Sequence, residues 1–366
     1  MHPETVAIVH ERFTELAGSE KVVEVLAEIW PDATLYAPIV DRSVLPAGLR
    51  DREIRTSSLQ RRYHGGDYRN LLPLLPRALA GMDLGSPDLV IVSHHAFANR
   101  ARVPTGAAMV SYTHTPARWI WDPAQRRMEG GMATRSFLTG LAATLRRSDR
   151  RAAAHPDRVI ANSPAVADRV RQWWGREATV VFPPVDVRFY TPDPSVPRED
   201  FLLVSGRLVP YKRPDVAVAA ATRYGWELVV AGDGRSRAQL QAEAGPNVRF
   251  VGRVSDEQLR SLYRRCRALL MPGVEDFGIV PVEAQACGAP VVALAEGGAT
   301  ASVVDGRTGI LYRPAGDQDD VSALGQAAAR LSEHKFDPVV LRAHAEQFGR
   351  ERFVARFQDE VAALRG

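Results

Sequence analysis

The segment Glu275-Asp-Phe-Gly-Ile-Val-Pro-Val-Glu283 holds two glutamates with seven residues between them. Pro281 suits the first turn of a helix, so we expect Glu275 on a loop and Glu283 in that first turn. The amides of Gly278–Val280 would then be helix-start donors that bind an anion, while the carboxylates accept hydrogen bonds from hydroxyls. Each glutamate alone is also explained as a helix-start charge. Together they suit a ligand with hydroxyls at both ends and phosphate in the middle, which is the layout of a nucleotide sugar.

A second candidate site lies in the segment Ser205-Gly206-Arg207-Leu-Val-Pro-Tyr-Lys212. It follows a predicted strand, so Arg207 and Lys212 should emerge at the strand's carboxyl end. Two cations on one loop can close on a diphosphate through charge-assisted hydrogen bonds. A solvated basic loop is the alternative, and the pair of glutamates favours the diphosphate site.

Two further segments follow predicted strands in the first half of the chain. His114 ends a strand that Pro116 stops, so its imidazole is a candidate for chemistry at the strand's end, although a lone histidine is often structural. Gly18 and Ser19 open a predicted helix after the first strand. They form either a plain helix cap or a loop that approaches a phosphate.

The elements that must position these residues alternate along the whole chain, as in βα units with parallel sheets. In such sheets ligands bind at the carboxyl ends of the strands. The strands predicted in the first half are Val6–His10, Thr34–Ala37, Leu89–His94, Ala108–Thr113, Val159–Asn162 and Thr179–Phe182. Those predicted in the second half are Phe201–Ser205, Glu227–Ala231, Val248–Val251, Ala268–Met271, Val291–Ala293 and Gly309–Tyr312.

Helices are predicted between the strands. In the first half they are Ser19–Ile29, Tyr68–Ala80, Thr134–Ala154 and Pro164–Trp174. In the second half they are Asp215–Tyr224, Ser236–Gly245, Asp256–Cys266, Val280–Cys287 and Val321–Leu331, followed by two helices within Pro338–Leu364. The five prolines between Phe182 and Asp200 indicate an interdomain linker. We predict an N-terminal domain (1–185), a C-terminal domain (186–345) and a final helix (346–366) that packs back on the first domain.

Length and composition bound the class of protein. At roughly 150 residues per domain, 366 residues predict two domains. The net charge of +4 argues against a dedicated nucleic-acid-binding protein. Only Lys21, Lys212 and Lys335 are lysines, against 44 arginines, which reflects either a GC-rich coding bias or a surface that seeks anions. Two cysteines, Cys266 and Cys287, are too few for a disulfide framework or a structural zinc site and fit a reducing cytoplasm.

Taken together, these motifs resemble glycosyltransferase family 4, retaining enzymes of the GT-B fold whose hallmark is Glu-x7-Glu. The resemblance covers nearly the whole chain and implies two doubly wound α/β domains that face a central cleft. It implies that the first (1–185) is the acceptor-side domain and that the second (186–345) is the donor domain. It implies that Arg207 and Lys212 hold the donor diphosphate, that Glu283 holds the ribose and that Glu275 holds the transferred sugar. The other donor-binding residues that it implies are Gly18, Ser19, Gly206, Gly232, Val251, Arg253, Val254, Phe277, Gly278, Ile279 and Val280. Among them, the backbone around Val251–Val254 would line the nucleobase pocket, with Gly232 nearby.

The resemblance also refines the expected reaction. His114 matches the family's active-site histidine, and SHHAFANR and EDFGIVPVEAQACG resemble a subgroup that transfers mannose from GDP-mannose. We therefore expect a hexose, foremost mannose, to move to a hydroxyl of a saccharide or lipid-linked acceptor. A UDP-sugar donor, a nucleotide-sugar epimerase and a non-enzymatic nucleotide-sugar binder are the alternatives. No cofactor or metal is expected, because Asp317-Gln318-Asp319 is better explained as a helix cap.

The expected location follows from what the sequence lacks. The start of the chain has neither the basic residues nor the apolar core of a signal peptide, and no apolar run reaches the roughly 20 residues that span a bilayer. We expect a cytoplasmic protein. The stretch Arg135–Arg158 is either a solvated helix face or a helix that lies on the anionic inner face of the cell membrane.

Overall fold

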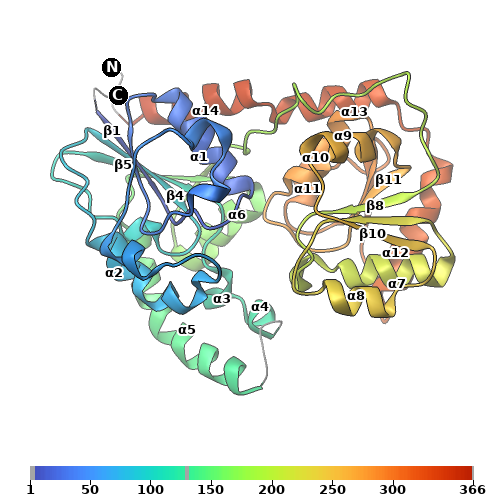
Figure 1. The fold of residues 1–366 in the computed structure, drawn as a ribbon, viewed down its shortest axis with the longest axis horizontal. Coiled ribbons are helices and arrows are strands. Elements are labelled where there is room, and N and C mark those ends of the chain that lie inside the picture. The colour runs from blue at the N-terminus through green and yellow to red at the C-terminus, as the bar shows by residue number, and fades with distance from the viewer. Residues whose placement is uncertain (1–4, 128–131, 365–366) are drawn as a thin grey trace. The chain divides into compact units, whose positions relative to one another are not determined.

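Figure 1 shows the computed structural model of the chain, which describes residues 5–127 and 132–364. The chain divides into two compact units, one made of Met1–Pro184 with Glu351–Gly366 and the other of Val185–Arg350. Each unit contains one parallel β-sheet, so the predicted α/β class with two Rossmann-like domains is confirmed. The sequence placed the boundaries after residues 185 and 345, and the units divide after Pro184 and Arg350.

The first unit is built on a sheet with the strand order β3-β2-β1-β4-β5-β6-β7. Its central strands are buried along their whole length, which explains their nearly continuous apolar sequences. The two-residue strand β3 was not predicted, because so short a segment carries no pattern. The strands are β1 (Val6–His10), β2 (Thr34–Tyr36), β3 (Ile54–Arg55), β4 (Leu89–His94), β5 (Ala108–Thr113), β6 (Arg158–Ala161) and β7 (Thr179–Val180).

Proline and glycine set the limits of the helices in the first unit. The predicted helix over 68–80 begins as a 3₁₀ segment (Tyr68–Leu74) that contains Pro73, and only its end is α-helical. The predicted helix over 164–174 ends in a π-helical turn (Val170–Trp174) before Gly175. The helices are α1 (Gly18–Ile29), α2 (Leu75–Ala80), α3 (Arg118–Trp121), α4 (Pro123–Arg127), α5 (Met132–Ala153), α6 (Pro164–Arg169) and α14 (Arg350–Ala362).

The second unit has a six-stranded sheet with the order β10-β9-β8-β11-β12-β13. The chain leaves β8 toward β9 on one side and later returns to β11 on the other, so a topological switch point lies between β8 and β11. All six strands were predicted to within one residue at each end. They are β8 (Leu202–Ser205), β9 (Leu228–Ala231), β10 (Val248–Gly252), β11 (Ala268–Met271), β12 (Val291–Leu294) and β13 (Gly309–Tyr312).

The helices of the second unit follow the sequence signals for helix starts. Ser255 and Gln258 form a capping box at α9, and Asp319 accepts a hydrogen bond from the amide of Ser322 at α12, which confirms the predicted cap. The helices are α7 (Pro214–Tyr224), α8 (Arg237–Glu243), α9 (Asp256–Arg265), α10 (Ile279–Ala286), α11 (Ala299–Ser302), α12 (Asp320–Ala329) and α13 (Pro338–Ala345).

The last helix, α14, belongs to the first unit although it ends the chain (Figure 1). Phe353, Phe357 and Val361 lie in the same apolar cluster as the strands β1 and β5. The ring of Phe353 meets that of Tyr112 edge to face at 5.6 Å. The proline-rich segment over 182–200 forms no helix or strand, as predicted. Its residues 185–200 belong to the second unit, where the ring of Tyr190 lies 5.8 Å from that of Tyr263.

The arginine-rich helix α5 uses two of its arginines inside the first unit. Arg146 donates hydrogen bonds to the carbonyls of Ile120 and Trp121, and Arg150 donates to the carbonyl of Trp173. The side chains of residues 132–135, 137 and 138 lie outside the described part of the structure, so membrane contact of this helix stays a prediction. In the described residues, no helix is both long and apolar enough to cross a bilayer.

Candidate functional site

Lys212 and Glu275 form an ion pair at the switch point of the second sheet. Lys212 ends the turn Pro210–Lys212 after β8, and Glu275 lies on the loop after β11. The Nζ atom of Lys212 is 2.6 Å from Oε1 of Glu275. Because β8 and β11 are neighbours, the two loops that the sequence singled out separately are brought together at the edge where such sheets bind ligands.

Both side chains of this ion pair are partly buried. Each side chain is one-fifth exposed. Burial lowers the pKa of Lys212, but Glu275 and Tyr211 together more than offset that effect, so the pKa of Lys212 is raised above its ordinary value. Lys212 is therefore a fixed cation at neutral pH, and its partner is a carboxylate that a ligand's hydroxyls could also engage.

Arg207 lies on the same loop as Lys212 but has other surroundings. Its side chain is exposed, and its Nη2 atom donates a hydrogen bond of 3.4 Å to the hydroxyl of Tyr211. The two predicted cations therefore lie on one loop, with Lys212 held in place and Arg207 at the surface. Tyr211 is a contact that the sequence analysis did not single out.

Glycines bring the loops of this edge into backbone contact. Gly232 has a φ of 138°, and a Cβ atom on it would lie 1.9 Å from the carbonyl oxygen of Gly206. No side chain fits in that space, so Gly232 is required for the close approach of the loops after β8 and β9, while Gly206 is favoured by its own φ of 123°. At three glycines that were not predicted, an added Cβ atom would likewise clash with the backbone of a predicted residue. These pairs are Gly273 with Lys212, Gly297 with Glu275, and Gly298 with Phe277.

The start of α10 lies between the two glutamates. Gly278 is its N-cap with a φ of 84°, and the amides of Ile279 and Val280 are the first two of the helix. Such amides have no acceptor within their own helix, which gives this end partial positive charge. Phe277 is buried, with its ring 5.5 Å from that of Phe348, so it anchors the turn. The predicted anion-binding amides are present beside Glu275.

The sequence prediction for Glu283 was wrong in one respect. Because α10 begins at Ile279, Glu283 is its fifth residue and lies in the second turn rather than the first. Its side chain is buried, and the hydroxyl of Tyr263 donates a hydrogen bond of 3.1 Å to its Oε2 atom. The Tyr263 hydroxyl also lies 3.4 Å from Oγ of Ser205, at the end of β8. Tyr263 thus positions Glu283, a role that no sequence pattern indicated.

The predicted nucleobase residues lie where β10 ends. Val251 is the penultimate residue of that strand, and Arg253 and Val254 follow it on the loop before α9. Gly252 accepts a hydrogen bond of 2.7 Å from the amide of Gly232. This contact joins the end of β10 to the glycine pair described above. The role of these residues in nucleobase binding stays a prediction.

In the first unit, Gly18 and Ser19 begin α1 as predicted, and their contacts are those of a helix start. Glu20 accepts hydrogen bonds through Oε2 from the amide of Ala17 at 2.9 Å and from the hydroxyl of Ser19 at 2.8 Å. Ser19 is buried, so its hydroxyl is used within the unit. The N-cap of α1 is Ala17 and its amide is capped by Glu20, so Gly18 and Ser19 are the first two helical residues and not the cap. Donor binding by these two residues stays a prediction.

His114 belongs to a buried chain of polar side chains that includes Glu20. Its Nε2 atom is 2.8 Å from Oγ of Ser93, which is 3.0 Å from Nδ1 of His10. The Nε2 atom of His10 is in turn 3.2 Å from Oε1 of Glu20. The ring of His95 stacks on that of His114 at 4.5 Å. His114 had been predicted, whereas Glu20, His10 and Ser93 had not, although His10 ends the first predicted strand, Ser93 begins SHH and Glu20 directly follows Ser19.

The pKa values along this chain are set mainly by burial. Burial lowers the pKa of His114 to about 3, and the nearby His10 adds to the effect. The pKa of His95 is also well below its ordinary value, again mainly because of burial. Burial raises the pKa of Glu20, but the hydrogen bonds from His10 and Ser19 outweigh it, so the net pKa is lowered. At neutral pH, His114 and His95 are neutral and Glu20 is ionised.

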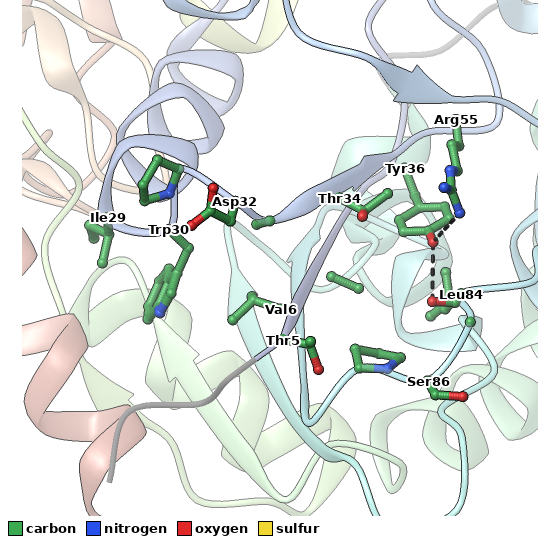
Figure 2. Close-up of a pocket in the computed structure, with 15 residues that line it drawn as sticks. Thr5, Val6, Ile29, Trp30, Asp32, Thr34, Tyr36, Arg55, Leu84 and Ser86 are labelled. Atoms are coloured by element: carbon green, nitrogen blue, oxygen red, sulfur yellow. Dashed lines mark hydrogen bonds between the residues drawn. The ribbon is translucent and has the colours of Figure 1, made fainter.

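A cavity of about 400 Å³ lies elsewhere, at the amino ends of β1 and β2 in the first unit. Figure 2 shows the Tyr36 hydroxyl within it, which donates to the carbonyl of Leu84 and accepts from Arg55. None of the predicted site residues lines this cavity. It therefore does not correspond to the sites above, which follow the carboxyl ends of strands.

Family comparisons match each half of the chain separately. Residues 16–189 match the family described as Glycosyltransferase Family 4, and residues 192–345 match Glycosyl transferases group 1. The first match spans α1 and His114, and the second spans Lys212, Glu275 and Glu283. Both sets of predicted residues therefore fall inside glycosyltransferase sequence families.

Curated relatives carry glycosyltransferase names, and solved structures share the fold. A D-inositol 3-phosphate glycosyltransferase of Kribbella flavida is 32% identical over 53% of this chain and 54% of its own length. One from Catenulispora acidiphila is 29% identical over 80% of this chain and 78% of its own length. The chain spans about half the length of several curated relatives that it matches. The structure of Anabaena HepE in complex with UDP has a TM-score of 0.72 at 19% identity and covers 98% of this chain and all of its own.

Proposed function

Because this chain belongs to the glycosyltransferases of the GT-B type, we propose that it transfers a sugar from a nucleoside diphosphate sugar to an acceptor hydroxyl. The observation that carries this proposal is the Lys212–Glu275 pair at the switch point, beside the first amides of α10. A cation and unpaired amides suit a diphosphate, and a carboxylate next to them suits the hydroxyls of the attached sugar.

In this mechanism the second unit stabilises the leaving group. Lys212, Arg207 and the amides of Ile279 and Val280 would neutralise the charge that develops on the departing diphosphate. Preorganised electrostatic stabilisation of this kind usually contributes most to catalysis. Glu275 would orient the transferred sugar, and Glu283, held by Tyr263, would accept hydrogen bonds from the ribose. We expect the product to retain the anomeric configuration of the donor, which proton NMR of the product measures.

Two donors are proposed for the first tests. The sequence resemblance favours mannose from GDP-mannose, whereas the Anabaena HepE structures with UDP and UDP-glucose favour a UDP-sugar. A saccharide, a lipid-linked saccharide and a phosphorylated inositol are the acceptors to be compared, the last because of the relatives' printed name. Catalysis without cofactor or metal, and a site at the cytoplasmic face of a membrane, are part of the same proposal.

The test combines binding and turnover. Thermal shift and calorimetry with GDP, UDP and their sugars should identify one nucleotide that binds, and assays of nucleotide release should then show dependence on an acceptor. Glu275→Gln should abolish most transfer and leave binding of the free nucleoside diphosphate within about threefold, since the free diphosphate lacks the sugar that Glu275 orients. Conversion of the donor without acceptor would indicate an epimerase. Tight binding with no product from any acceptor would indicate a binding protein, and absence of nucleotide binding would overturn the proposal.

A further inference from the structure

Asn162 carries a buried amide group that the first unit leaves unpaired. The residue follows β6 directly and precedes Ser163, the N-cap of α6. Its side chain is 6% exposed, and its Oδ1 atom has no hydrogen-bond partner among the residues that the structure describes. A buried amide oxygen without a partner costs stability, so most such groups in folded proteins are paired. The unpaired amide is therefore a candidate contact for a ligand.

The sheet places Asn162 beside His114, at the carboxyl ends of two neighbouring strands. Thr113 is the register partner of the last residue of β6, and the amide N–H of Asn162 donates to the carbonyl of Thr113 at 3.3 Å. His114 and Asn162 are thus the next residues of the two strands. Two positions earlier, Tyr112 and Ile160 pack in the same apolar cluster. Because side chains alternate along a strand, His114 and Asn162 face the same side of the sheet.

His95 extends this row on the other side of His114. It follows β4, and its partly exposed ring stacks on the ring of His114 at a centroid distance of 4.5 Å and an angle of 15°. The Nε2 atom of His114 is 2.8 Å from Oγ of Ser93. In the described part of the chain, Nδ1 is therefore the ring nitrogen of His114 that remains for a ligand. Three neighbouring strands end in one row of hydrogen-bonding side chains.

None of the three side chains in this row is charged at neutral pH. Burial keeps the pKa of His95 well below its ordinary value and lowers the pKa of His114 to about 3, and an amide does not titrate. Arg12, whose charge also disfavours protonation of His95, is engaged by the ring and the hydroxyl of Tyr68. An anion would find no cation within the row to offset the loss of its hydration. A hydroxyl both donates and accepts, so it can bond to either tautomer of a neutral imidazole and to either end of an amide.

We propose that Asn162 and His95 are acceptor-binding residues, which together with His114 form a subsite for the hydroxyls of an uncharged part of the acceptor. The assignment to the acceptor rests on the proposed function, in which the second unit binds the diphosphate and the sugar of the donor. A bound hydroxyl gives the Asn162 amide the partner that the unit itself does not supply. Asn162 thus serves binding at a cost to stability, a trade-off typical of functional sites.

The unpaired amide allows a test that does not depend on activity. Asn162→Ala removes a buried oxygen that has no partner, so the melting temperature should not fall. Asn247→Ala is the control, because Nδ2 of Asn247 donates to the carbonyls of Ala221 and Trp226 at 2.9 and 2.6 Å. Loss of these bonds should lower the melting temperature by about 2–4 °C. A fall in Asn162→Ala as large as that in Asn247→Ala would show that the amide holds the fold, and would overturn the proposal.

Ligand class is tested with two uncharged polyols, myo-inositol and methyl α-mannoside, by saturation-transfer NMR on the full chain. Both should give signals with the parent protein and with Asn247→Ala, and weaker signals with Asn162→Ala. His95→Phe keeps a ring against His114 but lacks the ring nitrogens, so it should weaken the same signals. Asn162→Asp keeps an oxygen that accepts from a hydroxyl and should retain more signal than Asn162→Ala. Equal signals in the parent and Asn162→Ala, or binding of inorganic phosphate that Asn162→Asp abolishes, would overturn the hydroxyl subsite.

Kinetics separate this subsite from the proposed function. In Asn162→Ala we expect kcat/KM for the acceptor to fall about tenfold or more, the scale of one or two lost hydrogen bonds, while calorimetry gives an affinity for the free nucleotide within about twofold of the parent's. If polyol binding depends on Asn162 but no nucleotide binds the parent protein, the proposed function fails and the subsite stands. If nucleotide release requires an acceptor whose kcat/KM is the same in Asn162→Ala and the parent, the subsite fails and the proposed function stands.

Discussion

The Nζ atom of Lys212 and the Oε1 atom of Glu275 are 2.6 Å apart, on two loops that are 63 positions apart in the chain. The pair joins the loops that follow β8 and β11. These are the neighbouring strands between which the strand order of the second sheet reverses. A bound diphosphate would give Lys212 a second anion, and a bound sugar would give Glu275 hydroxyl donors. The ion pair thus holds both side chains in position before a ligand arrives.

Removal of the Lys212 cation should lower turnover about a hundredfold, the scale of deleting one group that stabilises transition-state charge. The measurement is kcat of Lys212→Ala with the donor identified by the binding panel. Lys335→Ala is the control, because Lys335 is an exposed lysine of the same unit. If a folded Lys212→Ala protein keeps normal turnover, Lys212 does not hold the diphosphate. Arg207→Ala should show a loss of the same order.

The hydrogen bond from Tyr263 to Glu283 should strengthen nucleotide binding. Tyr263→Phe leaves Glu283 without this donor, and a bond to a charged group contributes about 1.5 kcal/mol or more, so Kd should rise roughly tenfold. Tyr190→Phe is the matched control, since the rings of the two tyrosines are in contact and the buried hydroxyl of Tyr190 has no partner in the described residues. Equal effects of the two substitutions in calorimetry would argue against a positioning role for Tyr263.

The close approach of Gly232 to Gly206 should not tolerate a methyl group. Gly232→Ala would place a Cβ atom 1.9 Å from a backbone carbonyl, so the loop that carries Lys212 must move. We expect nucleotide affinity to fall at least tenfold. Gly316→Ala tests backbone strain alone, because Gly316 also has a positive φ but open space around it, and should cost about 1–2 kcal/mol of stability. Unchanged nucleotide affinity in folded Gly232→Ala would contradict this account.

The pH dependence of stability should reveal the buried carboxyl of Asp149. Burial raises its pKa, and this outweighs the hydrogen bonds of 2.7 Å that the indoles of Trp121 and Trp174 donate to Oδ2. A raised folded-state pKa gives a stabilising contribution that is present below the unfolded value, near 3.8, and is lost as the pH rises through the folded value. In Asp149→Asn, the side chain keeps an oxygen that accepts from the indoles but can no longer carry a negative charge.

The melting temperature of Asp149→Asn relative to the parent protein should therefore increase as the pH is raised from 4 to 7. Asp149→Ala leaves two buried indole N–H groups without an acceptor and should lose about 1–3 kcal/mol for each of them across this range. A difference between Asp149→Asn and the parent that does not change with pH would show that the carboxyl ionises without cost.

Much of the fold was predictable, because strands buried on both faces produce apolar runs that local sequence displays. The six strands of the second unit and the positions of Lys212 and Glu275 after two of them followed from such runs. The contact between Lys212 and Glu275 could not be predicted from these runs, because contacts across a sheet depend on the order of its strands. The bonds from Tyr263 to Glu283 and from Ser93 to His114 link residues far apart in sequence, each of which carries an ordinary local pattern. The start of α10 was predicted at Val280 and lies one residue earlier, at Ile279, because a proline is tolerated throughout the first turn of a helix and does not fix which residue begins it.

The return of the chain to the first unit through α14 has a consequence for synthesis. A ribosome delivers residues from the N-terminus, and domains generally fold as their residues become available. The second unit is one continuous segment, but the apolar cluster around Tyr112 and Trp30 is closed by Phe353 and Phe357, which are made last. The half of the protein that is synthesised first therefore completes its core last, and a fragment that ends at Pro184 would expose the surface that α14 covers.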